Sequence, residues 1–236
     1  MSISDYFQLS ENKLFFSKQQ GSDFAKLIAN DFNPIHDVDA KKFCVPGDLL
    51  FAVILHQYGL YQKMSFNFSG MVSDTNSLIL PQQITEDKVS IKDDNGKEFL
   101  NFFATGEKTE KLPLINSFVQ EYVEFSGKAF PHLLVPLMEK ENVMVNPDRP
   151  LIVYESMEIQ LDHVEFSGLN LELYQTGIDV QGKRAKACLQ FELVSDGRKI
   201  GCGKKNMILS GLKPYEKDIM EKLVEQYVLR TQNLSS

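Results

Sequence analysis

The sequence predicts an α+β fold in which an apolar helix followed by antiparallel strands occurs twice, with a further helix at the C-terminus. Two observations support this prediction: helical and extended patterns follow the same order in both halves, and Gly-containing turns separate several of the extended runs. In each half the apolar helix needs a surface on which to be buried, and the following strands provide it. The chain has 236 residues, 43% of them hydrophobic, which is enough for a large core. The halves share no residue-level repeat, so element order alone supports the duplication.

The first half, residues 1–110, is predicted to contain two helices and three strands. Ser22 to Asn30 is typical of a short helix, because Ser22 can cap it and apolar residues fall on one face. Pro46 to Gln62 is predicted as a second helix, whose first part is apolar on nearly every side and should therefore be buried. The predicted strands are Met64 to Val72, Lys88 to Lys92 and Glu98 to Glu107, with Asn95-Gly96 as a hairpin turn.

The second half, residues 111–236, repeats this order. A charged stretch that ends in proline, Glu107 to Pro113, is predicted as the linker between the halves. Asn116 to Glu141 has a helical pattern, with breaks expected near its two prolines. Tyr215 to Thr231 is predicted as an amphipathic C-terminal helix. The predicted strands are Leu151 to His163, Leu171 to Val180, Arg184 to Val194 and Lys199 to Ser210.

Composition and charge argue against several classes of partner. The net charge of -7 disfavours nucleic-acid binding, which needs a basic face. The most apolar run, Leu49 to Leu55, is too short to span a bilayer, and the N-terminus lacks an apolar signal segment. The 3 cysteines and 4 histidines are scattered, so we expect reduced thiols and no metal site. We therefore expect a cytoplasmic protein that binds neither nucleic acid nor membranes.

The segment DFNPIH, Asp31 to His36, combines an acid, an Asn-Pro pair and a histidine between the first two predicted helices. Pro34 cannot continue a helix, and a bend at this point can direct both ionisable side chains into one cleft. Such a pair suits general acid–base chemistry, although an ordinary turn with a hydrogen-bonded histidine would use the same residues. Gly47 falls in the first turn of the buried helix, where its free N–H is a candidate donor to a polarised carbonyl oxygen.

The string FAKLIANDFNPIH, Phe24 to His36, resembles the signature of the MaoC-like, (R)-specific enoyl-CoA hydratases. The resemblance implies the hotdog fold, in which an antiparallel sheet wraps a long helix, and here a double hotdog with a C-terminal helix. It also implies reversible hydration of a trans-2-enoyl-CoA to a 3-hydroxyacyl-CoA, without metal or redox cofactor. The substrate would be a thioester of CoA or of acyl carrier protein, and a homodimer is compatible with the resemblance.

The resemblance assigns roles to individual residues. Asp31 and His36 would bind and activate water, Gly47 would hold the thioester oxygen, and Asn33 would contribute to substrate binding. The family's Ser-Gly before the acid is replaced by Ala29-Asn30, which could alter the turn that directs Asp31. An acid, Asp48, follows Gly47 and would oppose an oxyanion if it pointed inward.

In the second half, Phe125 to Leu134 faintly echoes the motif, with Lys128 in place of the acid. We expect this half to be non-catalytic and to wall the acyl tunnel. Several basic residues are candidates for contact with CoA phosphates, although solvent exposure is commoner for such side chains; they are Lys41, Lys42, Lys183, Arg184, Lys186, Lys204 and Lys205. Two alternatives remain beside the hydratase: a catalytically inactive acyl-thioester-binding module and a hotdog thioesterase.

Overall fold

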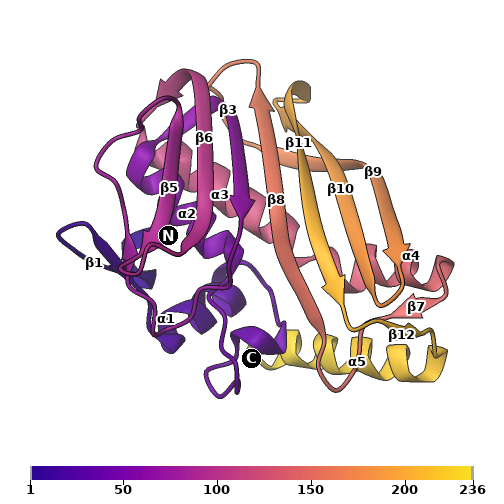
Figure 1. The fold of residues 1–236 in the computed structure, drawn as a ribbon. Helices are drawn as coiled ribbons and strands as arrows, with labels where there is room; N and C mark the ends of the chain where they lie inside the picture. Colours follow the sequence, from indigo (N-terminus) through magenta and orange to yellow (C-terminus); the bar gives the residue numbers. More distant parts are fainter. Residues whose placement is uncertain (1, 235–236) are drawn as a thin grey trace.

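The computed structural model describes residues 2–234, which form a 10-stranded antiparallel sheet with helices packed against it (Figure 1). The strand order is β1-β2-β4-β5-β6-β3-β8-β11-β10-β9, and β12 and β7 form a separate small sheet. No helix within residues 2–234 has both the length and the apolar character that a membrane span requires.

The N-terminal half opens with short elements that the sequence did not predict: the 3-10 helix η1 (Ile3–Tyr6) and strands β1 (Gln8–Ser10) and β2 (Lys13–Phe15). The helix predicted from Ser22 begins earlier, as α1 (Lys18–Asp23), and continues into the π-helical turn η2 (Phe24–Ile28). Its cap is therefore Ser17, which forms a capping box with Gln20, and the proposed capping by Ser22 is wrong. Ser22 is buried and accepts a hydrogen bond from Lys26 instead.

The predicted apolar helix is α2 (Gly47–Tyr58), and every residue from Leu49 to Leu55 is buried, as expected. It ends four residues before the predicted end, because Gly59 adopts a φ of 93° and turns the chain into a strand. The following strands are β3 (Leu60–Phe68), β4 (Leu78–Ile79), β5 (Lys88–Asp93) and β6 (Glu98–Thr109).

The C-terminal half confirms the four predicted strands, with small shifts at their ends. The predicted linker is wrong: β6 runs to Thr109 and the next helix starts at Leu112, so only Glu110 and Lys111 connect the halves. The long helical pattern is broken near Pro131, as predicted, by a π-helical turn. The elements are α3 (Leu112–Gly127), η4 (Phe130–Leu134), α4 (Val135–Lys140), β7 (Val143–Met144), β8 (Leu151–Leu161), β9 (Asn170–Gln181), β10 (Arg184–Ser195), β11 (Arg198–Ser210), β12 (Lys213–Pro214) and α5 (Lys217–Leu234).

In the large sheet, the four strands that follow each central helix have the same order. The first of the four pairs with the last, β3 with β6 and β8 with β11. The two first strands then pair with each other, with Met64 opposite Ile159, so that one continuous sheet covers both α2 and α3 (Figure 1). The fold is thus the predicted double hotdog with a C-terminal helix. The division at residues 110 and 111 into two domains stays a prediction.

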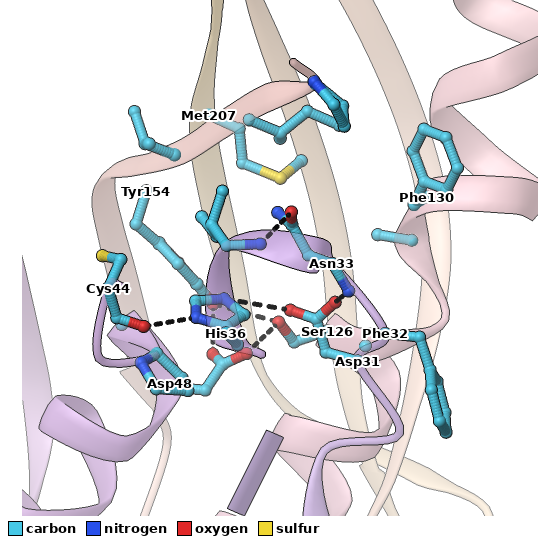
Figure 2. Close-up of a pocket in the computed structure, with 18 of the residues that line it drawn as sticks. Asp31, Phe32, Asn33, His36, Cys44, Asp48, Ser126, Phe130, Tyr154 and Met207 are labelled. Carbon is cyan, nitrogen blue, oxygen red and sulfur yellow. Dashed lines mark hydrogen bonds and ion pairs between the residues drawn. The ribbon is translucent and has the colours of Figure 1, made fainter. Parts of the chain in front are cut away.

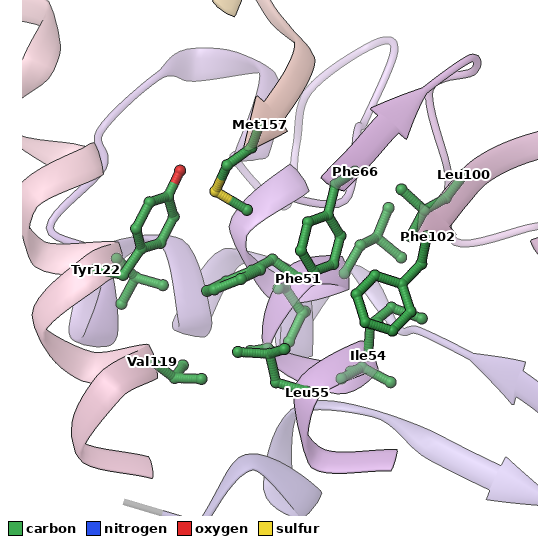
Figure 3. Close-up of a cluster of buried hydrophobic side chains, with 14 of the residues drawn as sticks. Phe51, Ile54, Leu55, Phe66, Leu100, Phe102, Val119, Tyr122 and Met157 are labelled. Atoms are coloured by element: carbon green, nitrogen blue, oxygen red, sulfur yellow. The ribbon is translucent and has the colours of Figure 1, made fainter. Parts of the chain in front are cut away.

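The core joins the two central helices through aromatic side chains. Phe51 of α2 lies 5.2 Å from the ring of Phe66 on β3 and 4.6 Å from the ring of Tyr122 on α3, measured between centroids. Figure 3 shows these rings in one cluster with Met157 of β8. Because the cluster includes both central helices and the strands of the β3–β8 junction, the halves are held together by a shared apolar core.

Candidate active site

The loop that carries Asp31 and His36 follows η2 and is fixed by local hydrogen bonds. The Asp31 N–H donates to the Ala25 carbonyl at 2.7 Å, and Asn30 has a φ of 53°. This left-handed conformation is one that asparagine tolerates better than most residues with a side chain. Asn30 therefore makes the turn before Asp31 at the position where the resembling family has glycine.

Asp31 and His36 are brought together, as the motif predicted. The Asp31 Oδ2 atom lies 3.6 Å from His36 Nε2, and the other carboxylate oxygen accepts a hydrogen bond from the Asn33 N–H at 2.9 Å. The Asn33 side-chain oxygen caps the short 3-10 helix η3 (Pro34–His36) by accepting from the Ile35 N–H. Figure 2 shows the imidazole and the carboxylate facing each other in the pocket.

The hydrogen bond of His36 Nδ1 determines whether Nε2 is free to accept a proton. His36 Nδ1 lies 2.6 Å from the Cys44 carbonyl oxygen, which can only accept a hydrogen bond. The proton of the neutral ring must therefore sit on Nδ1, and Nε2 keeps its lone pair toward Asp31. Since His36 is only 6% exposed, the ring is held in this orientation by its surroundings.

Burial is the main cause that raises the pKa of Asp31 above its ordinary value. The neighbouring His36 and the Asn33 N–H oppose this rise, the Asp48 carboxylate adds to it, and the Lys205 ammonium opposes it. A carboxyl with a raised pKa keeps its proton to a higher pH than an exposed carboxyl does, which suits a general acid–base group.

Asp31→Asn is expected to stabilise the protein at neutral pH. A group whose pKa is higher in the folded state loses its contribution to stability as the pH rises from its unfolded pKa through its folded pKa. Asparagine has no charge to desolvate, so we expect a melting temperature about 2–4 °C higher at pH 7.5, which corresponds to roughly 1 kcal/mol at this chain length. Thermal melts at several pH values test this. The difference should shrink toward pH 4, and the exposed Asp39→Asn should show none; a lower melting temperature at pH 7.5 would contradict the expectation.

Gly47 opens α2 and lines the same pocket. A Cβ at this position would lie 2.8 Å from Cδ2 of Tyr154, so the close approach of that ring requires glycine. Across residues 2–234, the N–H groups of Gly47 and Asp48 have no hydrogen-bond acceptor. They are thus available to a ligand at the positive end of the helix dipole.

The Asp48 carboxylate is buried, at 4% exposure, and is bound by hydroxyl groups of the second half. It accepts hydrogen bonds from Ser126 at 2.5 Å and from the Tyr154 hydroxyl at 2.6 Å. Tyr122 lies 2.6 Å from the Tyr154 hydroxyl, and both tyrosines have a pKa raised well above the ordinary value, mainly by burial. The charge of Asp48 is therefore engaged by donors rather than left unpaired beside Gly47.

Two polar residues of the second half were missed as part of the site, Ser126 on α3 and Tyr154 on β8, and Lys205 on β11 was considered only as a possible contact to CoA phosphates. The expectation of solvent exposure is wrong for Lys205, which is 3% exposed and donates to the Ser126 hydroxyl. A signal was present in the sequence, because Lys205 stands between Gly203 and Met207 at alternate positions of a strand, and all three are buried. Of the other candidate lysines, Lys204 is partly exposed and pairs with Glu158.

The pocket lies where the two halves meet and is lined mainly by apolar side chains. Each half contributes, and α5 covers one side with Leu223 and Tyr227. Among residues 2–234, no three or more His, Cys, Asp or Glu side chains lie close enough together to hold a metal ion. The apolar lining includes Phe32, Ile35, Leu50, Phe68, Met71, Val72, Ala129, Phe130, Leu134, Ile152, Val153 and Met207.

The helix α5 holds the loop of Asp31 through Tyr227. The Phe32 N–H donates to the Tyr227 hydroxyl at 3.2 Å, and the hydroxyl is within donor distance of the Gly127 carbonyl, at 3.2 Å, and the Asn30 carbonyl, at 3.4 Å. Arg230 adds an ion pair with Asp37 at 2.9 Å. The residues on both sides of Asp31 are thus attached to the C-terminal helix.

Tyr227→Phe is expected to destabilise the protein by about 1–3 kcal/mol, because a buried N–H and nearby carbonyls lose their partner. Urea unfolding measures the change. Tyr174→Phe is the matched control, since that hydroxyl is exposed and bonds Gln190, and it should change stability by less than about 0.5 kcal/mol. Equal midpoints for the two variants would show that Tyr227 does not hold the loop.

Together, the fold and the pocket define a double-hotdog protein with an acid–histidine pair beside its first central helix. The chain belongs to the family DUF3581, described as a protein of unknown function, whose model matches residues 1–218. No curated protein matches the sequence.

Several solved structures are similar in fold at low sequence identity. An acyl-CoA thioesterase II, TesB2, from Mycobacterium marinum has a TM-score of 0.44 and 9% identity, covering 92% of this chain and 100% of that one. A hot dog fold protein of unknown function from Alicyclobacillus acidocaldarius has a TM-score of 0.43 and 9% identity, covering 89% of this chain and 96% of that one. A MaoC-like dehydratase has a TM-score of 0.41 and 8% identity, covering 85% of this chain and 96% of that one.

Proposed function

We propose that the protein is a hydratase/dehydratase of acyl thioesters, which interconverts trans-2-enoyl-CoA and 3-hydroxyacyl-CoA. The observation that carries the proposal is the convergence of the Asp31 carboxylate and the His36 imidazole, 3.6 Å apart, on a largely apolar pocket. The resemblance of Phe24 to His36 to the MaoC-like hydratase signature supports the same chemistry. The apolar lining suits an acyl chain, and the carrier would be CoA or acyl carrier protein.

His36 is the proposed base for the water. Its Nε2 lone pair is free because Nδ1 donates to the Cys44 carbonyl. A water held between Nε2 and the Asp31 carboxyl can give its proton to Nε2 while its oxygen forms a bond to the β-carbon of the enoyl group. Asn33 keeps its side-chain NH₂ group for substrate, since its oxygen is used in capping η3.

The second proton transfer completes the addition. As the carbon–oxygen bond forms, the electrons of the double bond move to the α-carbon and the thioester carbonyl oxygen, giving an enolate. Asp31 or the protonated His36 then delivers a proton to the α-carbon, so that water is added overall and no electron is exchanged with a cofactor. The short distance between the two groups allows the proton to return to its starting position. Gly47 N–H is the proposed donor to the enolate oxygen.

A turnover assay tests this proposal. The protein is incubated with trans-2-enoyl-CoAs of short and medium chain length, and three quantities are followed: enoyl absorbance, 3-hydroxyacyl-CoA by mass spectrometry, and free thiol. We expect loss of the enoyl group with formation of the 3-hydroxy product and no thiol release. Thiol release without hydration would assign the protein to the thioesterases, and tight binding by calorimetry without any product would make it a binding module; either result overturns the proposal.

A further inference from the structure

Lys205 is a buried cation in the wall of the pocket, opposite the half that carries Asp31 and His36. It lies on β11, is 3% exposed, and its Nζ stands 3.7 Å above the centroid of the Tyr154 ring. One of its N–H groups donates to the Ser126 hydroxyl. In the described part of the chain, no other oxygen lies within hydrogen-bond or ion-pair distance of this ammonium.

An ammonium has three donors, and leaving donors unpaired in a buried place is unfavourable. Lys205 lines the pocket, so its unused N–H groups are accessible to a molecule bound there. The same Tyr154 ring that lies under Lys205 also packs against Gly47, where a Cβ would come within 2.8 Å of it. The ammonium and the start of α2 therefore both lie beside the Tyr154 ring, in the wall of the same pocket.

The surrounding charges indicate which kind of oxygen this is. Burial lowers the pKa of Lys205, and the carboxylates of Asp48 and Asp31 oppose the change. Two carboxyl groups and a single ammonium share this part of the pocket, so there is no excess of positive charge to bind a permanently anionic group such as a substrate carboxylate. A neutral carbonyl oxygen that gains negative charge only during the reaction fits this balance better.

A relay of hydroxyl groups fixes the position of Lys205. Lys205 donates to Ser126, Ser126 donates to Asp48 at 2.5 Å, and the Tyr154 hydroxyl donates to the other oxygen of Asp48 at 2.6 Å. Asp48 thus acts through Ser126 as a positioning residue for the ammonium. Asp48 therefore supports an ammonium that can face a thioester oxygen, instead of repelling negative charge on that oxygen.

We infer that Lys205 Nζ binds the thioester carbonyl oxygen of the substrate and, together with the Gly47 N–H, stabilises the enolate charge during hydration. The inference rests on the proposed function and adds to it a catalytic residue from the second half. The ammonium donates a hydrogen bond throughout and transfers no proton, so the balance of the hydration step is unchanged.

Lys205→Met tests the inference, because methionine fills similar space without a donor. We expect kcat for hydration to fall by about 10²–10³-fold, the usual effect of removing one such donor. Lys199→Met is the matched control: it lies on the same strand, is exposed and pairs with Glu192, so kcat should stay within about twofold. If wild type and Lys199→Met hydrate the substrate, a Lys205→Met protein that is folded and equally fast overturns the inference and leaves the proposed function intact.

A second measurement tests the contact even if Lys205→Met does not fold, because its first arm uses the Asp31→Asn protein alone. In the Asp31→Asn background, which should bind substrate without turnover, the infrared stretch of a ¹³C-labelled thioester carbonyl reports its polarisation. We expect a shift to lower frequency on binding, with most of the shift lost in Asp31→Asn/Lys205→Met. A bound carbonyl with its solution frequency overturns the inference. Absence of hydration by wild type would instead mark failure of the proposed function.

Discussion

Asp31→Asn is expected to lower kcat/KM for enoyl-CoA hydration by about 10²–10⁴-fold, the range that general acid–base groups contribute. Asparagine preserves the shape and can still accept the hydrogen bond from the Asn33 N–H, now at 2.9 Å. It cannot exchange a proton with the water or with His36 Nε2, which lies 3.6 Å from Asp31 Oδ2. The loss should therefore be in kcat, with KM changing little.

Initial rates at saturating and limiting substrate separate these two constants. Asp39→Asn is the control, because it removes a carboxylate from the same loop at an exposed position. His36→Ala should lose activity to a similar extent, and the double variant should be little worse than either single one, since the two groups act as a unit. If Asp31→Asn and His36→Ala both retain wild-type rates, the pair has no part in the chemistry.

Gly127→Ala is expected to disturb both stability and activity, although only a methyl group is added. Gly127 ends α3 against the loop of the first half: a Cβ there would lie 1.6 Å from the Ala29 carbonyl oxygen and 2.7 Å from the Ala29 carbonyl carbon. Both neighbours are backbone atoms and cannot move aside as a side chain would. The chain just before Asp31 must therefore shift, and overpacking of this kind costs about 1–3 kcal/mol or more.

A displacement of the Asp31 loop by about 1 Å can reduce a rate by about 10²-fold. Urea unfolding and the hydration assay together measure the two effects of Gly127→Ala. Gly177→Ala on β9 is the control, because no atom lies within 4 Å of the added Cβ and the change should be nearly silent. A Gly127→Ala protein with wild-type stability and rate would show that the contact between α3 and the loop is not tight.

The parts of the fold that were predictable have strong local patterns. The helix α2 is apolar on nearly every side, and turns such as Asp196-Gly197 separate the long strands of the second half. The end of α2 was placed too late because Leu60 to Gln62 suit a helix as well as a strand, and only the conformation of Gly59 decides between them. The short strands β1 and β2 were missed because 3 residues give no measurable alternation.

The difference between local and long-range signals also explains which residues of the site could be predicted. Asp31 and His36 are close in sequence and joined by a rigid bend, so one motif could reveal both. Asp48 and Tyr154 are 106 positions apart, and Ser126 and Lys205 are 79 apart, so only the pairing of β3 with β8 and of β11 with β8 brings them together. The sequence alone does not distinguish Lys205 from its neighbour Lys204, although successive residues of a strand point to opposite faces of the sheet.

The hydrogen bonds from Ser126 and Tyr154 to Asp48 have an evolutionary consequence. Although the chain contains two similar units, neither unit can accumulate substitutions at these positions independently of the other. Loss of the acid at position 48 would leave the lysine at position 205 without its indirect counter-charge. Loss of that lysine would leave the buried acid without a nearby positive charge. We therefore expect these positions to change together among related sequences, as a linked set that spans both halves of the chain.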